Sequence, residues 1–144
     1  MTGTISGSSV NQQTSSGRNL FRSIALWTLQ ILLALLFLAT GCMKLLTPPA
    51  VMQAQLAVPF PQWFIYFIGV AECAGGLGLL LPGILRIQRR LTPIAACGLV
   101  IITIGAVAVT LLGGMGIAAA LFPLIVSLLC ALIVFARRSW FAQA

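Results

Sequence analysis

The chain of 144 residues contains no histidine, and Glu72 is its one acidic side chain. Zinc, haem and iron–sulfur sites are built from histidine, cysteine and carboxylate ligands. The cysteines lie inside apolar runs with no C-x-x-C spacing; they are Cys42, Cys73, Cys97 and Cys130. We therefore expect no metal site and no intrinsic cofactor within one subunit, and we interpret the cysteines as small apolar packing residues.

Charge of either sign is scarce. Charged residues make up 6% of the chain and hydrophobic residues 60%, and the mean hydropathy is +1.13. A soluble domain is about one quarter charged, so this chain could not cover a water-exposed surface with polar groups. The composition instead predicts an integral membrane protein in contact with the lipid bilayer, and the length leaves no room for a separate soluble catalytic module.

The basic residues flank the long apolar runs and do not form one patch, although the net charge is +7. This placement is typical of a membrane protein and argues against nucleic-acid binding. With four spans, Lys44 stands alone on one side of the membrane and all the arginines lie on the other. The positive-inside rule then predicts that both termini are cytoplasmic. The arginines are Arg18, Arg22, Arg86, Arg89, Arg90, Arg137 and Arg138.

Four apolar segments are long enough to cross a bilayer core of about 30 Å at about 1.5 Å per residue. The predicted fold is all-α, a bundle of four transmembrane helices in one domain over residues 18–144. The helices are expected at about 22–46, 62–85, 91–112 and 115–136. The glycine-rich stretch at 113–116 supplies the turn between the last two helices.

The segments around the first span differ in composition. Residues 1–17 are rich in Ser, Thr, Gln and Asn, which predicts a disordered polar tail. The apolar run that follows exceeds the roughly 7–15 residues of a signal-peptide core, so we expect an uncleaved helix. Four prolines between residues 45 and 62 then prevent a continuous helix.

Glu72 is an ionisable group deep in the second span. It lies 14 residues before Arg86, which corresponds to about 20 Å along a helix. A lipid-facing charge at the membrane centre costs at least about 2.5 kcal/mol, so the side chain should point into the bundle. Thr103 and Ser127 lie at a similar depth on the last two spans.

Each span presents one small, weakly polar face. Such faces let neighbouring helices approach closely, and we expect the four faces to meet. The glycines assigned to helix packing are Gly41, Gly69, Gly75 and Gly76. Gln30 and Lys44 share the face of Gly41, while Ala106, Thr110 and Gly116 belong to the faces of the last two spans.

Lys44 is the one basic residue on the predicted outer side, and three arrangements are open to it. It could pair with Glu72 directly, through a water or ligand, or extend to the outer headgroups. Glu72 itself could join helices through Thr103 or Gln30, or it could form a ligand or proton site, as intramembrane ionisable groups often do. The candidate ligand or proton site comprises Glu72, Lys44, Gln30, Thr103 and Ser127.

The order of the motifs TGCMKL, VPFP, IGVAECAGGLGLLLP and RRLTPIAACGLVIITIGA resembles the DoxX-like membrane proteins over residues 24–135. The resemblance implies a four-helix bundle in a bacterial cytoplasmic membrane. Some relatives are membrane subunits of thiosulfate:quinone oxidoreductase, some join redox-linked complexes, and animal relatives act as assembly chaperones. The anchors are Gly41, Lys44, Leu45, Pro59, Glu72, Gly75, Gly76, Leu79, Pro82 and Pro93.

These observations leave three functional hypotheses. The protein could be a non-autonomous subunit of a redox-linked complex that binds a quinone or another lipophilic molecule near Glu72 and Lys44, with Glu72 accepting or donating the proton that accompanies quinone reduction. It could instead be a non-catalytic assembly or scaffold protein whose Gly and Ala faces dock a partner helix, or a small carrier of protons or solutes, as a homo-oligomer, with Glu72 as the coupling site. Without an electron carrier of its own, redox chemistry would need another subunit, and we do not expect an autonomous enzyme.

Overall fold

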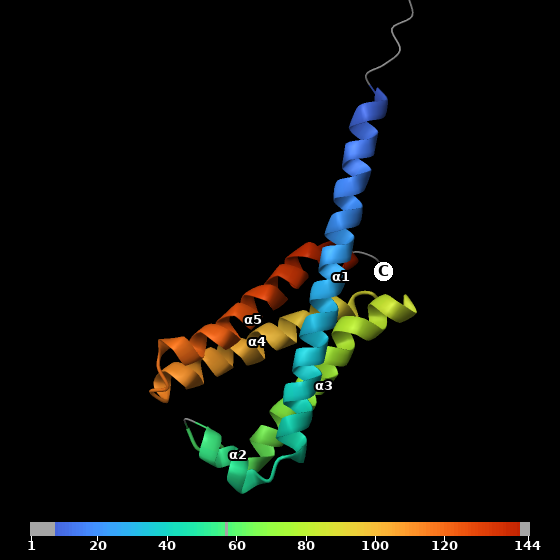
Figure 1. Ribbon diagram of the computed structural model, residues 1–144. Helices are drawn as coiled ribbons and strands as arrows, with labels where there is room; N and C mark the ends of the chain where they lie inside the picture. Colours follow the sequence, from blue (N-terminus) through green and yellow to red (C-terminus); the bar gives the residue numbers. More distant parts are fainter. Residues whose placement is uncertain (1–7, 57, 142–144) are drawn as a thin grey trace, which may run out of the picture.

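The computed structural model describes residues 8–56 and 58–141, and this part of the chain is helical with short connections. Each of its four long helices contains a segment long and apolar enough to cross a membrane. They are α1 (Ser8–Leu46), α3 (Gln62–Leu85), α4 (Leu91–Leu112) and α5 (Ile117–Ala136), with the short α2 (Pro49–Gln55) after α1 and a 3-10 turn (Arg138–Phe141) after α5 (Figure 1). The protein is therefore a multi-pass membrane protein with the predicted four-helix architecture.

A proline precedes the start of α3, and glycines form the turn between α4 and α5. α3 begins directly after Pro61, whose backbone is extended, and the turn between α4 and α5 uses Gly114 and Gly116 with φ of 73° and 88°. Glycine adopts these left-handed angles without steric cost. The bounds of α3 and α4 coincide with the expected ones, whereas α5 begins two residues later than expected because this turn extends through Gly116.

The first helix is longer than the sequence predicted. α1 begins at Ser8, so residues 8–17 are helical where a disordered tail was expected. A helix is costly to nucleate but cheap to extend, and residues 8–17 contain no proline and one glycine, Gly17, which weakens a helix without ending it. The 39 residues of α1 measure about 58 Å, and its N-terminal part projects beyond the other helices (Figure 1). The rest of the expected tail, residues 1–7, lies outside the described residues.

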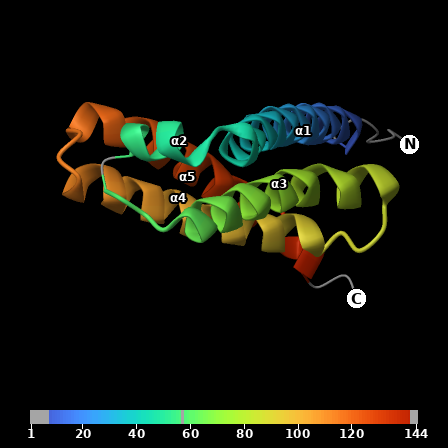
Figure 2. The same ribbon diagram turned by 90° about the horizontal axis from the view of Figure 1, so that it is seen from below.

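The long helices form two pairs, α1 with α3 and α4 with α5 (Figures 1 and 2). The pairs come together at the end that carries Arg89 and Arg137, which we call the basic end. Toward the opposite end, which carries α2 and which we call the α2 end, α4 and α5 slope away from α1 and α3 (Figure 1). Helix pairs that cross at an angle contact near the crossing and diverge beyond it.

The buried apolar core lies in the half of the bundle nearer the basic end. All four long helices contribute to it, with Leu33, Ala34, Phe37, Leu79, Ala96, Leu99, Val126, Cys130 and Ile133. The small faces meet there as expected. Nearer the α2 end, Ala106 and Gly116 are exposed and Thr110 is partly exposed. The expected meeting of the four faces is therefore limited to one half of the bundle.

Candidate functional site

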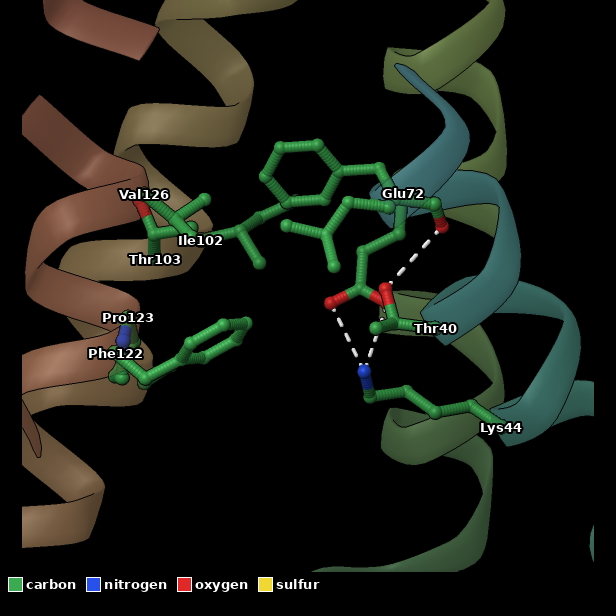
Figure 3. Close-up of a pocket in the computed structure, with 11 residues that line it drawn as sticks. Thr40, Lys44, Glu72, Ile102, Thr103, Phe122, Pro123 and Val126 are labelled. Carbon is green, nitrogen blue, oxygen red and sulfur yellow. Dashed lines mark hydrogen bonds and ion pairs between the residues drawn. The ribbon is translucent and has the colours of Figure 1, made fainter. Parts of the chain in front are cut away.

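A cleft of about 210 Å³ opens between the two helix pairs where they begin to diverge. Figure 3 shows Glu72 and Lys44 on one side of this space, with Phe122, Pro123 and Thr103 across from them. The other lining side chains are mainly apolar, and they include Leu36, Phe37, Ile102 and Val126. The cleft therefore combines apolar walls with one strongly polar group.

That polar group is an ion pair between Lys44 and Glu72. The Lys44 Nζ atom donates to Glu72 Oε2 at 2.7 Å and to Oε1 at 2.9 Å. The carboxylate is buried, while the lysine side chain is 26% exposed. Each charge offsets part of the cost of removing the other from water. Of the arrangements that the sequence left open for Lys44, the structure forms the direct contact.

Glycines bring α1 close enough to α3 for this contact. A Cβ atom added at Gly41 would lie 2.7 Å from the carbonyl oxygen of Gly69, and one added at Gly69 would lie 3.2 Å from Lys44 Cβ. A Cβ at Gly76 would lie 3.0 Å from the carbonyl oxygen of Ala34. Backbone therefore meets backbone along the α1–α3 contact. Gly75 instead faces Leu99 of α4, at 2.6 Å from the position of an added Cβ.

The ion pair retains hydrogen-bonding capacity. An ammonium group has three donors, and an ionised carboxylate offers about four acceptor positions. Two of the three N–H donors of Lys44 bond to Glu72. The third donor has no hydrogen-bond acceptor among the described residues. Both side chains line the cleft, so a molecule in the cleft could bond to either group.

Thr103 lies across the cleft and does not bond to Glu72. Its hydroxyl donates within α4, to the carbonyl oxygens of Leu99 at 2.8 Å and Val100 at 3.0 Å. The alternative in which Thr103 or Gln30 bonds to the Glu72 carboxyl is therefore not observed in the structure. Beside Thr103, Pro123 interrupts the hydrogen bonding of α5.

Gln30 lies away from the cleft, at the basic end. Its Nε2 atom donates to the carbonyl oxygen of Leu79 at 3.0 Å, and its Oε1 accepts from Arg137 Nη2 at 3.0 Å. The Arg137 guanidinium also lies over the ring of Trp27, 5.8 Å from the centroid. Burial, and next the positive charges of Arg89 and Arg22, lower the pKa of Arg137. Gln30 thus ties α1 to α3 and to the end of α5.

The five candidate residues therefore fall into two groups. Lys44, Glu72 and Thr103 line the cleft, whereas Gln30 and Ser127 are buried outside its lining. Sequence reasoning did not assign Phe122 to the site. The one sequence feature that could have indicated Phe122 is its position beside a proline within an apolar span.

Comparisons with known proteins give one result. No curated protein and no solved structure matches the chain significantly. The sequence profile of the DoxX-like family matches residues 28–133, which include Lys44, Glu72, Thr103 and the remainder of the cleft lining. The match covers most of the chain and extends through all four membrane-spanning helices. The chain therefore belongs to the DoxX-like family.

Proposed function

We propose that the cleft binds the polar head of a quinone and that the protein is a non-autonomous subunit of a redox-linked complex in a bacterial cytoplasmic membrane. One observation carries this proposal. An ion pair with spare hydrogen-bonding capacity lines an otherwise mainly apolar cleft between membrane-spanning helices. Such a combination suits a ligand with a polar head and an apolar body, because a few placed polar groups orient a ligand that apolar walls hold.

The size of the cleft limits what it can hold. An engineered apolar cavity of about 150 Å³ binds a benzene ring, so about 210 Å³ accommodates one ring with small substituents. A whole lipid tail exceeds this volume. The tail of a bound quinone would therefore leave the cleft between the diverging helix pairs and continue into the bilayer.

The ion pair supplies two kinds of contact to a quinone head. The remaining donor of Lys44 would bond to a quinone carbonyl oxygen. Glu72 would give or accept one of the protons that accompany quinone reduction and oxidation. The electrons would come from a partner subunit, because no three His, Cys, Asp or Glu side chains among the described residues lie close enough together to hold a redox metal.

The arginine distribution orients this proposal in the membrane. The basic end would face the cytoplasm, and the cleft would open in the outer half of the bilayer. A reporter fused to the C-terminus that is active in the cytoplasm but inactive in the periplasm would support this orientation. The opposite pattern would overturn it.

The geometry argues against docking of a partner helix on the four glycines assigned to helix packing. A scaffold would offer its glycine faces to a partner helix. Gly41, Gly69 and Gly76 instead face the chain's own helices within α1–α3, and Gly75 faces α4. These four positions are therefore not available to a partner while the bundle is folded.

Quinone retention tests the proposal. The protein would be reconstituted in lipid nanodiscs with a short-chain ubiquinone, washed, extracted and analysed by chromatography. We expect stoichiometric retention by the natural chain and loss in the double variant Lys44→Met, Glu72→Gln, which removes both charges together. The control Thr28→Val removes a hydroxyl that bonds within α1 at an exposed position, and it should retain quinone. Equal retention by the natural chain and the folded double variant would overturn the proposal.

A further inference from the structure

Two cysteines that are far apart in the sequence meet between α1 and α3. The Sγ atoms of Cys42 and Cys73 lie 4.0 Å apart, and both cysteines are free thiols. A disulfide has an S–S length of about 2.05 Å, so the sulfurs would need to approach by about 2 Å. No motif in the sequence pairs these two cysteines, and their setting in apolar runs indicates small apolar packing residues.

The helix contact holds these thiols in reach of each other. Disulfides need the two backbones to lie close together, with Cα atoms about 4.4–6.8 Å apart. Gly41, next to Cys42, brings the two backbones together here, because a Cβ added there would lie 2.7 Å from both Cys73 Sγ and the Gly69 carbonyl oxygen and 3.1 Å from the Cys73 nitrogen. The proximity of the sulfurs thus results from the tightest part of the α1–α3 contact.

The two thiols differ in access. Cys42 is exposed and Cys73 is partly buried, and α1 at this level is a membrane-spanning helix. A reagent that dissolves in the bilayer can therefore reach Cys42. Neither thiol lines the cleft, so the following inference does not depend on quinone binding.

We propose that Cys42 and Cys73 form a redox-active dithiol that a lipid hydroperoxide oxidises to a disulfide. The Cys42 sulfur attacks the terminal peroxide oxygen, the O–O bond breaks, and the lipid alcohol leaves with the thiol proton. Cys42 is then a sulfenic acid. The Cys73 sulfur attacks the Cys42 sulfur, the S–S bond forms, and the hydroxyl leaves with the Cys73 proton as water. Two thiols lose two electrons in total, and the hydroperoxide gains them as it becomes an alcohol.

The disulfide would change the wall of the cleft. Cys42 lies two residues before Lys44, and Cys73 directly follows Glu72. A covalent bond between the cysteines would fix α1 to α3 beside the ion pair. The α4–α5 pair, which carries Cys97 and Cys130, would gain no covalent bond to that wall.

The reduced full-length chain in nanodiscs, one copy per disc, would be treated with linoleic acid hydroperoxide. Of the four thiols we expect two to be lost, with an intact mass lower by two hydrogens, a Cys42–Cys73 peptide on mapping, and full reversal by a reductant. The variant Cys97→Ser, Cys130→Ala should react in the same way.

A control moves one thiol around the helix. Cys42→Ser with Met43→Cys keeps an exposed thiol on α1, since Met43 is also exposed, but directs it about 100° away. This variant should form no intramolecular disulfide. A disulfide in the control, a disulfide between other cysteines, oxidation of Cys42 to a sulfinic or sulfonic acid without a bond to Cys73, or an unreactive natural chain would each overturn the proposal.

Discussion

The two halves of this bundle accommodate buried polar groups in different ways. Near the basic end, Gln30 is fully buried and its amide bonds to Leu79 and Arg137, so the polar group is enclosed by the core. Near the α2 end, the charges of Lys44 and Glu72 satisfy each other but border an open cleft. We call the half near the basic end the closed half, and its polar contacts join the helices. We call the half near the α2 end the open half, and its polar groups are accessible to a ligand.

The largest effect on stability should come from a change in the α1–α3 contact. Gly41→Leu would place a side chain against the Gly69 backbone, where an added Cβ already lies at 2.7 Å. We expect the free energy of unfolding to fall by about 3 kcal/mol or more, measured by thermal or denaturant unfolding in detergent. The control Gly105→Leu lies on α4 with no atom near its added Cβ, and it should be tolerated. Equal stability of the two variants would contradict the described α1–α3 contact.

Breaking the ion pair of the open half should have the next largest effect. Lys44→Met leaves the Glu72 carboxylate buried without a counter-ion, which costs about 3 kcal/mol when a buried pair loses one partner. The double variant Lys44→Met, Glu72→Gln should recover most of this loss, because no buried charge remains. Unfolding measurements on the two single variants and the double variant form the cycle. Additive losses would show that the two side chains do not interact.

A smaller loss of stability should follow from removing the Gln30 hydrogen bonds in the closed half. Gln30→Leu removes the bonds to Leu79 and Arg137 and leaves a buried carbonyl without that donor, which costs about 1–3 kcal/mol. Quinone retention should persist, because Gln30 does not line the cleft. Both quantities would be measured on one preparation. Loss of quinone with unchanged stability would reverse the roles that we assign to the two halves.

The smallest effect is expected for Thr103→Val. The hydroxyl bonds to carbonyl groups of its own helix, which already bond within the helix, so the loss in stability should stay below about 1 kcal/mol. The Lys44–Glu72 pair should remain, because Thr103 is not bonded to it. Thermal unfolding checks the first expectation. A destabilisation as large as that of Lys44→Met would indicate that Thr103 supports the ion pair.

Much of the fold follows from local signals in the sequence. Pro61, Arg86 and Gly113 lie at the ends of α3 and α4. Such end residues affect the backbone conformation of only a few neighbouring residues. The sequence allowed the Lys44–Glu72 contact as one of several arrangements. Helical spacing predicts which face of its helix a side chain lies on, but it does not predict which side chain of another helix it contacts.

The divergence of the helix pairs could not be predicted in this way. The small residues of α4 and α5 continue toward the α2 end in the sequence, yet Ala106 and Gly116 are exposed there. Crossing angles depend on how whole surfaces interlock, which no single motif encodes. The separation of Gln30 from Glu72, and the approach of Cys42 to Cys73, follow from the same packing.

The divergence of the two helix pairs is best tested by spin-label distances between α1 and α5 in nanodiscs. One pair of labels, at Ile31 and Leu132, lies near the basic end, and the other, at Met43 and Leu121, lies nearer the α2 end; all four positions are exposed. The labels would be introduced as cysteines in a chain without its natural cysteines. We predict that the Met43–Leu121 distance exceeds the Ile31–Leu132 distance by several ångströms. Equal distances would contradict the open half, and with it the cleft beside Glu72.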